Sequence, residues 1–112
     1  PLTPGLVQSG LYQQRLTAAG IETLVPDPPR QTALMDQILC FKDTGNITPL
    51  TNIARRICRE LVDKGTEAIA YACTEVPLAL AGQPPSCPFY DTLDVLASAC
   101  IREAQKEQGS EP

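Results

Sequence analysis

Apolar residues recur at spacings of three and four along two long stretches of the chain, which is the pattern of amphipathic helices. The stretches cover residues 31–44 and 49–64, and each is followed by a glycine, Gly45 and Gly65, of the kind that ends helices. Thr48 stands where the second helix would need a capping residue. The pattern therefore predicts two helices, each with one apolar side directed to a core.

Three further helices are predicted by the same criterion. The first spans residues 9–20, with Ser9 at the N-cap position. The second covers residues 74–81, and the third covers residues 92–106. The apolar side of this last helix is expected to face inward, and it consists of Leu93, Leu96, Ala97, Cys100 and Ile101.

Short apolar runs between these helices predict β-strands. Residues 21–25 and 88–90 are bounded by proline-rich turns, and residues 68–72 form a nearly uninterrupted apolar run. A run of that kind is typical of a strand buried on both faces in a parallel sheet. A further strand is expected in front of Thr3, because the chain opens on a turn-like PLTPG segment.

The alternation of helices and strands predicts an α/β fold, in which an open parallel sheet of three to four strands is flanked by helices. One lobe of residues 1–107 is expected, with its first strand truncated, followed by a frayed tail at residues 108–112.

Composition excludes several classes of function. The chain has 112 residues with 9 basic and 13 acidic ones, and its scattered lysines and arginines form no basic stripe for nucleic acid. No apolar run reaches the length of a membrane span. Five cysteines without a CxxC pair, and no histidine, give no metal-ligand pattern and rule out a histidine base. Unpaired thiols of this kind indicate a reducing, cytoplasmic location.

Candidate chemistry gathers at three predicted strand-to-helix turns. Ligands of open α/β sheets bind beyond the carboxyl ends of the strands. The turns would bring together a rim of side chains, namely Thr3, Ser9, Cys73, Thr74 and Asp91. Cys73 would lie at a helix N-terminus, where the helix dipole favours a thiolate and neighbouring amides can hold a carboxylate. The alternative is a small buried cysteine that merely ends a strand.

The other candidates have simpler interpretations. Cys40, Cys58 and Cys100 lie on or beside apolar helix sides and are predicted core residues, while Cys87 should lie at the sheet end away from the rim. Lys42 could reach an anionic substrate, or it could be a solvated surface lysine. Glu75 could be a capping acid without a function.

Three segments resemble one protein family in the same order and at the same spacing. SGLYQQRLTAAGIETLVPD, AIAYACTEVPLAL and CPFYDTLDVLA resemble the second half of the aspartate/glutamate racemase family, and the similarity runs from about Thr3 to about Ala104. The Cys-Thr-Glu triplet that ends at Glu75 resembles the aspartate branch. The resemblance implies that the chain is the carboxy-terminal lobe of a two-lobed racemase.

The resemblance also implies a mechanism. These racemases need no cofactor and use two cysteines, one from each lobe, on opposite faces of the Cα atom of a small acidic amino acid. Cys73 matches the second-lobe cysteine. The matching substrate-binding positions are Thr74, Thr3, Ser9, Lys42 and Glu75.

Departures from the family pattern leave alternatives open. Ala72 replaces a glycine, Leu6 replaces a threonine of the carboxylate-binding loop, and the first lobe is missing. The chain is therefore expected to be inactive without an amino-terminal lobe or a second copy as partner. Alternatives are hydantoin racemisation, maleate isomerisation or arylmalonate decarboxylation, or a non-catalytic binding domain that forms a homodimer.

Overall fold

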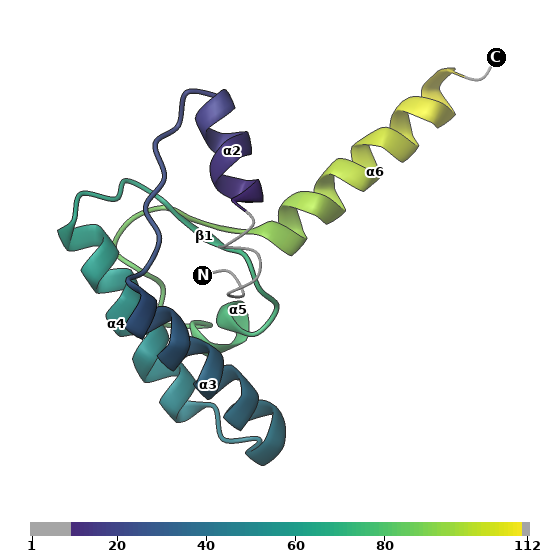
Figure 1. The fold of residues 1–112 in the computed structure, drawn as a ribbon. Coiled ribbons are helices and arrows are strands. Elements are labelled where there is room, and N and C mark those ends of the chain that lie inside the picture. Colours follow the sequence, from purple (N-terminus) through teal and green to yellow (C-terminus); the bar gives the residue numbers. More distant parts are fainter. Residues whose placement is uncertain (1–9, 111–112) are drawn as a thin grey trace.

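The computed structural model describes residues 10–110 and contains a small parallel sheet flanked by helices (Figure 1). Its elements in chain order are α2 (Leu11–Ala18), α3 (Pro28–Thr44), α4 (Thr48–Asp63), β1 (Ile69–Tyr71), α5 (Val76–Ala79), β2 (Phe89–Asp91) and α6 (Thr92–Ser110). The predicted α/β class is confirmed. The described part of the sheet has two strands, and the strand expected before Thr3 falls outside the described residues.

Helix α4 is the centre of the hydrophobic core. It lies alongside α3 in Figure 1 and also packs against α5. Its buried side is formed by Leu50, Thr51, Ala54, Ile57, Cys58 and Leu61. Leu34 and Ile38 of α3 meet this side, and Ile69 and Tyr71 of β1 complete the core. The helical periodicity of residues 31–44 and 49–64 was thus a correct guide to the core.

The ends of α3 and α4 follow from particular residues. Gly45 closes α3 with a φ of 74°, a left-handed conformation that suits glycine. At the end of α4, Gly65 N–H donates to Val62 O (2.9 Å) and Thr66 N–H to Leu61 O (3.1 Å), the Schellman arrangement. The prediction that Thr48 caps α4 was wrong. Thr48 is the first helical residue, and its N–H donates instead to Asn46 Oδ1 at 3.2 Å.

Polar contacts join the helices around this core. The buried Thr51 hydroxyl donates to the main-chain carbonyl of Ala79 at 2.8 Å, which ties α4 to α5. Arg30 Nε on α3 donates to both carboxylate oxygens of Glu60 on α4, at 3.0 and 3.1 Å. Arg56 also reaches Glu60 at 3.3 Å. These hydrogen bonds from Arg30, and then Arg56, hold the pKa of Glu60 below its usual value.

The two strands pair in parallel, with Ile69 opposite Phe89 and Tyr71 opposite Asp91. The rings of Tyr71 and Phe89 stack with centroids 5.2 Å apart. The predicted strand at residues 68–72 is confirmed in type but is shorter, and its predicted burial on both faces was wrong. Ile69 and Tyr71 face the core, whereas Ala70 is exposed on the opposite face.

Residues 21–25 were predicted as a strand, and this was wrong: they adopt neither helix nor strand. Within residues 10–110 no main-chain hydrogen bond joins residues 22–26 to another segment. Ile21 and Leu24 are about half exposed, at 52% and 48%. The residue types suit a strand, but a strand forms only when a partner satisfies its main-chain groups.

Helix α6 extends away from the rest of the molecule (Figure 1). It contacts β2 and continues to Ser110, beyond the predicted end at Lys106. The expectation that its apolar side faces inward was wrong, since Leu93, Leu96 and Ile101 are all about half exposed. The radius of gyration, 16.0 Å, accordingly exceeds the value of about 13 Å for a compact domain of this length.

Candidate functional site

The carboxyl ends of β1 and β2 lie side by side and are joined by a side-chain hydrogen bond. Thr92, the first residue of α6, donates its hydroxyl to the carbonyl of Tyr71 at 2.9 Å. Asp91 accepts a hydrogen bond from the N–H of Leu93 at 3.0 Å. The segment that follows β1, residues 72–75, therefore begins next to Asp91, as predicted for parallel strands.

Cys73 lies in the loop between β1 and α5 and is half-buried against the core. The helix predicted over residues 74–81 is only four residues long and begins at Val76, with Glu75 at the N-cap position. Cys73 thus stands three residues before the first helical residue. The electrostatic effect of so short a helix is small, because the dipole grows with the number of aligned peptide units.

Lys42 and Glu75 form an ion pair across this end of the sheet. Lys42 Nζ, in the last turn of α3, is 3.3 Å from Glu75 Oε1. The Glu75 side chain is only 16% exposed, whereas Lys42 is 59% exposed. Partial burial acts to raise the pKa of Glu75, but hydrogen bonds from Thr74 and Lys42 outweigh it and hold that pKa below its usual value. The loop after β1 is thereby linked to α3.

The structure places some of the predicted site residues at the same end of the sheet, and others lie outside the described residues. Cys73, Thr74, Glu75, Lys42 and Asp91 surround the carboxyl end of the sheet. Thr74 is exposed. The two remaining candidates, Thr3 and Ser9, lie outside the described residues.

The remaining cysteines have different environments. Cys58 is buried, as predicted, and burial raises the pKa of its thiol. Cys87 is half-buried against the core and precedes β2, so it lies toward the amino end of the sheet. Cys40 and Cys100 are exposed, and the core interpretation was wrong for both. They lie on the parts of α3 and α6 that no described element covers.

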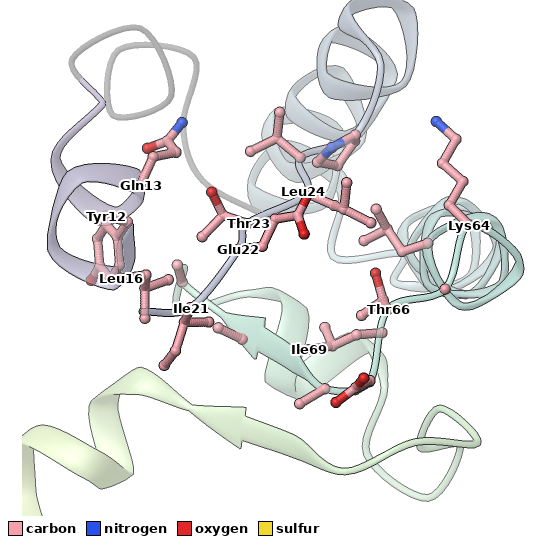
Figure 2. Close-up of a pocket in the computed structure, with 18 of the residues that line it drawn as sticks. Tyr12, Gln13, Leu16, Ile21, Glu22, Thr23, Leu24, Lys64, Thr66 and Ile69 are labelled. Carbon is pink, nitrogen blue, oxygen red and sulfur yellow. The ribbon is translucent and has the colours of Figure 1, made fainter. Parts of the chain in front are cut away.

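A hollow of about 630 Å³ lies beside β1, and its lining includes the core residues Leu61 and Ile69 as well as the exposed Ala70. Figure 2 shows it between α2, the segment after α2, the end of α4 and β1. Its lining includes Tyr12, Leu16, Thr66 and Ala70, and it reaches Ala72 but does not include Cys73. This hollow was not predicted from the sequence, because residues 21–25 were expected to form a strand.

Clustered metal ligands and membrane-spanning helices are both missing from the described part of the chain. Among residues 10–110, no three histidine, cysteine, aspartate or glutamate side chains are grouped so that they could hold a metal ion. In the same range no helix is both long enough and apolar enough to cross a membrane.

Comparison with known proteins identifies the family. A family model described as Asp/Glu/Hydantoin racemase matches residues 2–100. The chain therefore belongs to the Asp/Glu/hydantoin racemase family, as the three sequence segments indicated. A curated relative is the uncharacterized protein in the pnlA 3′ region of Pectobacterium carotovorum subsp. carotovorum. It is 29% identical over 86 residues, which are 77% of this chain and 57% of the relative, so the chain spans little more than half of that relative's length.

Proposed function

We propose that the chain supplies one of the two acid/base cysteines of a cofactor-independent racemase that acts on aspartate or a related acidic amino acid. In the proposed reaction, one thiolate takes the α-proton of the bound amino acid. The electron pair left on Cα is delocalised into the α-carboxylate. The opposite thiol then gives a proton to the other face of Cα. Cys73 is the proposed cysteine on this chain.

The observation that carries the proposal is the position of Cys73. It is the only cysteine within residues 10–110 that lies in a loop leading from a strand to a helix, and this strand ends beside the Asp91–Thr92 end of its neighbour. Ligands of parallel α/β sheets bind at this edge. Because the chain belongs to a racemase family, proton transfer at Cα is the reaction proposed for a cysteine at this position.

The ion pair of Lys42 and Glu75 supports an acidic substrate. Lys42 is largely exposed and is held at the same end of the sheet as Cys73. Its ammonium group can bind the side-chain carboxylate of a dicarboxylic amino acid, in competition with Glu75. In the proposal, Thr74 and the predicted residues Thr3 and Ser9 bind the α-carboxylate.

Two cysteines on opposite faces of the substrate are needed for inversion, and the proposal assigns this chain only one. The second comes from an amino-terminal lobe or from another copy of the chain. A site formed by Cys73 alone would remain open to water, and an open site stabilises a carbanion-like state poorly. We therefore expect no racemisation by a single copy of residues 1–112.

The test measures exchange of the α-proton of L- and D-aspartate in D₂O by proton NMR. The chain would be assayed alone and together with an amino-terminal lobe from a full-length family member. Inversion that requires both polypeptides, and that is abolished by Cys73→Ser, is the expected result. Cys100→Ser is the matched control, because Cys100 is exposed on α6, and it should leave the exchange unchanged. Inversion that persists in Cys73→Ser would refute the assignment.

A panel of substrates separates aspartate racemisation from the related reactions. A hydantoin, maleate and an arylmalonate would be offered to the same two-polypeptide mixture. A preference for aspartate that Lys42→Gln reduces is expected. If a hydantoin or an arylmalonate is turned over and aspartate is not, the proposed substrate is wrong. The role of Cys73 as the acid/base group would still stand.

A second candidate function is self-association without catalysis. The observation that favours it is the set of exposed apolar side chains on adjacent parts of β2 and α6, namely Phe89, Tyr90, Leu93, Val95, Leu96 and Ile101. Uncovered apolar surface of this kind marks interaction sites. Light scattering across a concentration series tests it, and a strict monomer would exclude the dimer.

A further inference from the structure

A second hollow, of about 230 Å³, lies between the second half of α4 and the segment that leads from α5 to β2. Two arginines line it, and it is called the arginine hollow below. Ile69 N–H donates to the carbonyl of Pro88 at 3.0 Å, so the residues just before Pro88 lie at the amino end of the sheet. The arginine hollow includes Ser86 and is therefore at the opposite end of the sheet from Cys73. None of its lining residues belongs to the candidate site.

The two arginines, Arg55 and Arg59, lie on adjacent turns of α4. Residues four apart on a helix have Cβ atoms about 5–6 Å apart, so these two positive charges repel each other. Both arginines are exposed, and within residues 10–110 neither forms an ion pair or a side-chain hydrogen bond. Arg56, by contrast, is paired with Glu60 at 3.3 Å. An anion between Arg55 and Arg59 would turn this repulsion into two attractive contacts.

The wall opposite α4 adds a rigid backbone and further hydrogen-bond donors. Gln83 N–H donates to the carbonyl of Leu80 at 3.0 Å, which closes a turn after α5. Pro84 and Pro85 follow, and the ring of each proline fixes its φ angle. The hydroxyl of Ser86 and the side-chain amide of Gln83 are donors in the lining. An oxyanion in the arginine hollow would thus meet donors on both walls.

The charge and the volume of the arginine hollow favour a phosphate monoester. A carboxylate carries one negative charge, which a single guanidinium group can satisfy, whereas a phosphate monoester carries nearly two and has three terminal oxygens for two guanidinium groups. The volume equals that of roughly eight water molecules at about 30 Å³ each, which leaves room for a short carbon chain beside the phosphate. Asp63 also lines the hollow, and its carboxylate can accept a hydrogen bond from a hydroxyl group on such a chain.

We propose that the arginine hollow binds the phosphate monoester of a small hydroxylated molecule, with the phosphate between Arg55 and Arg59 and with Ser86 as a further donor. The bound ligand contacts both α4 and the segment before β2, so it joins the helical body to the amino end of the sheet. A ligand that binds only the folded chain stabilises it. This inference does not depend on the reaction that Cys73 performs.

The test uses the full 112-residue chain and titrates it with inorganic phosphate, glycerol 3-phosphate and succinate near neutral pH. The ionic strength is held constant with sodium chloride, because salt screens exposed charges. Arginine Nε–H and main-chain amide signals are followed by ¹⁵N NMR. We expect saturable shifts at Arg55, Arg59 and Ser86, with a dissociation constant on the order of 1 mM for inorganic phosphate. Glycerol 3-phosphate should bind at least as tightly, and succinate about fivefold more weakly or less.

Variants with opposite expected effects locate the contact on the protein. Arg55→Gln and Arg59→Gln should each weaken phosphate binding about tenfold, because each removes a charge and its hydrogen bonds. Asp63→Asn removes a negative charge from the lining and should tighten the binding of inorganic phosphate about two- to threefold. The matched control is Arg102→Gln, at an exposed arginine of α6 that forms no ion pair among the described residues, and it should leave the affinity unchanged. Circular dichroism verifies that each variant is folded.

Three results would overturn the proposal. Equal shifts at all arginines, without saturation, would show only screening of surface charge. Succinate binding as tight as that of phosphate would exclude a site for phosphate esters. Saturable phosphate binding that persists when Arg55 and Arg59 are both replaced by glutamine would place the anion elsewhere on the chain.

Discussion

The helical part of the molecule and the region around its sheet differ in how completely they cover their own apolar residues. In the helical body, formed by α3, α4 and α5, Leu50 is 0% exposed and the inward side of α4 meets neighbours along its length. On α6, Leu96 is 60% exposed although it has the same chemical character. The body therefore contains its own core, whereas residues 10–110 leave the apolar side chains of α6 exposed.

The same difference appears in the polar interactions. The body has a buried hydrogen bond from Thr51 to α5 and the Arg30–Glu60 contact between α3 and α4. The ion pair on α6, between Lys106 and Glu103, lies within one helix and is exposed at both ends. Exposed pairs of this kind contribute little to stability. Side-chain contacts between elements thus join the helices of the body to one another, whereas α6 is tied to the sheet at its first residue, by the hydrogen bond from Thr92 to Tyr71.

The largest expected effect compares one leucine from each region. Leu50→Ala should lower the free energy of unfolding by about 2–5 kcal/mol, since it removes a fully buried side chain and leaves a cavity. Leu96→Ala should change it by less than about 0.5 kcal/mol, because that side chain is already largely in water. Urea unfolding followed by circular dichroism measures both. A loss at Leu96 as large as that at Leu50 would show that α6 is covered in solution.

A smaller effect is expected at high pH from Tyr71, which lies between the two regions. Burial raises the pKa of Tyr71 to about 12, while the unfolded chain loses this proton near the ordinary value of 10.0. Between those values the folded state holds the proton and the unfolded state does not, so the stability from this group is complete below pH 10 and falls as the pH rises. Through this group, the free energy of unfolding should fall by at most about 1.4 kcal/mol for each pH unit.

Tyr71→Phe isolates that contribution. The variant should lose stability less steeply than the parent between pH 10 and 11.5, measured by urea unfolding at each pH. The other tyrosines and the lysines titrate in both proteins, so they cancel in the comparison. Parallel curves for the two proteins would show that Tyr71 is more accessible to water than its 2% exposure indicates.

The smallest effect concerns the Lys42–Glu75 pair at the candidate site. Lys42→Gln should cost less than about 1 kcal/mol at pH 7, because Lys42 is largely exposed. Since the pKa of Glu75 is lowered in the folded state, the contribution is present above its unfolded pKa and is lost as the pH falls through the folded value. The difference between parent and variant should therefore shrink as the pH falls below the usual glutamate range, and it should vanish once Glu75 is protonated in the folded state.

An NMR titration of the Glu75 carboxyl group provides the direct measurement. In Lys42→Gln its pKa should rise toward the usual glutamate range, because the hydrogen bond and the charge of Lys42 are both removed. Lys106→Gln, at the exposed pair on α6, is the matched control and should leave the Glu75 titration unchanged. An unchanged Glu75 pKa in Lys42→Gln would show that the pair does not persist in solution.

Much of the helical body could be predicted from the sequence. The helices predicted at residues 31–44 and 49–64 follow from the local spacing of apolar residues. Their ends follow from glycines that favour a left-handed backbone conformation. Both signals can be read from neighbouring residues. Residues 21–25 and the apolar side of α6 could not be placed in this way. Both have the composition of buried segments, but within residues 10–110 they remain largely exposed, and burial depends on long-range contacts that a local pattern does not encode.

The candidate site was predictable to a similar extent. The order of strands and helices correctly indicated that Cys73, Thr74 and Asp91 lie at one edge of the sheet. The helix expected to begin at Thr74 was misjudged, because its start depends on how the Cys73–Glu75 loop packs rather than on helix propensity. The pairing of Lys42 with Glu75 joins residues 33 positions apart, a distance at which local patterns carry no information.

The isolation of α6 has an evolutionary consequence. Because the described side chains of α6, up to Lys106, contribute nothing to the buried core, a substitution on its apolar side is expected to leave the packing of α4 unchanged. Selection on Leu93, Leu96 and Ile101 must then come from whatever those residues touch outside the described chain. Relatives that share such an outside contact should retain apolar residues at these three positions. Relatives that lack it should have polar residues there more often.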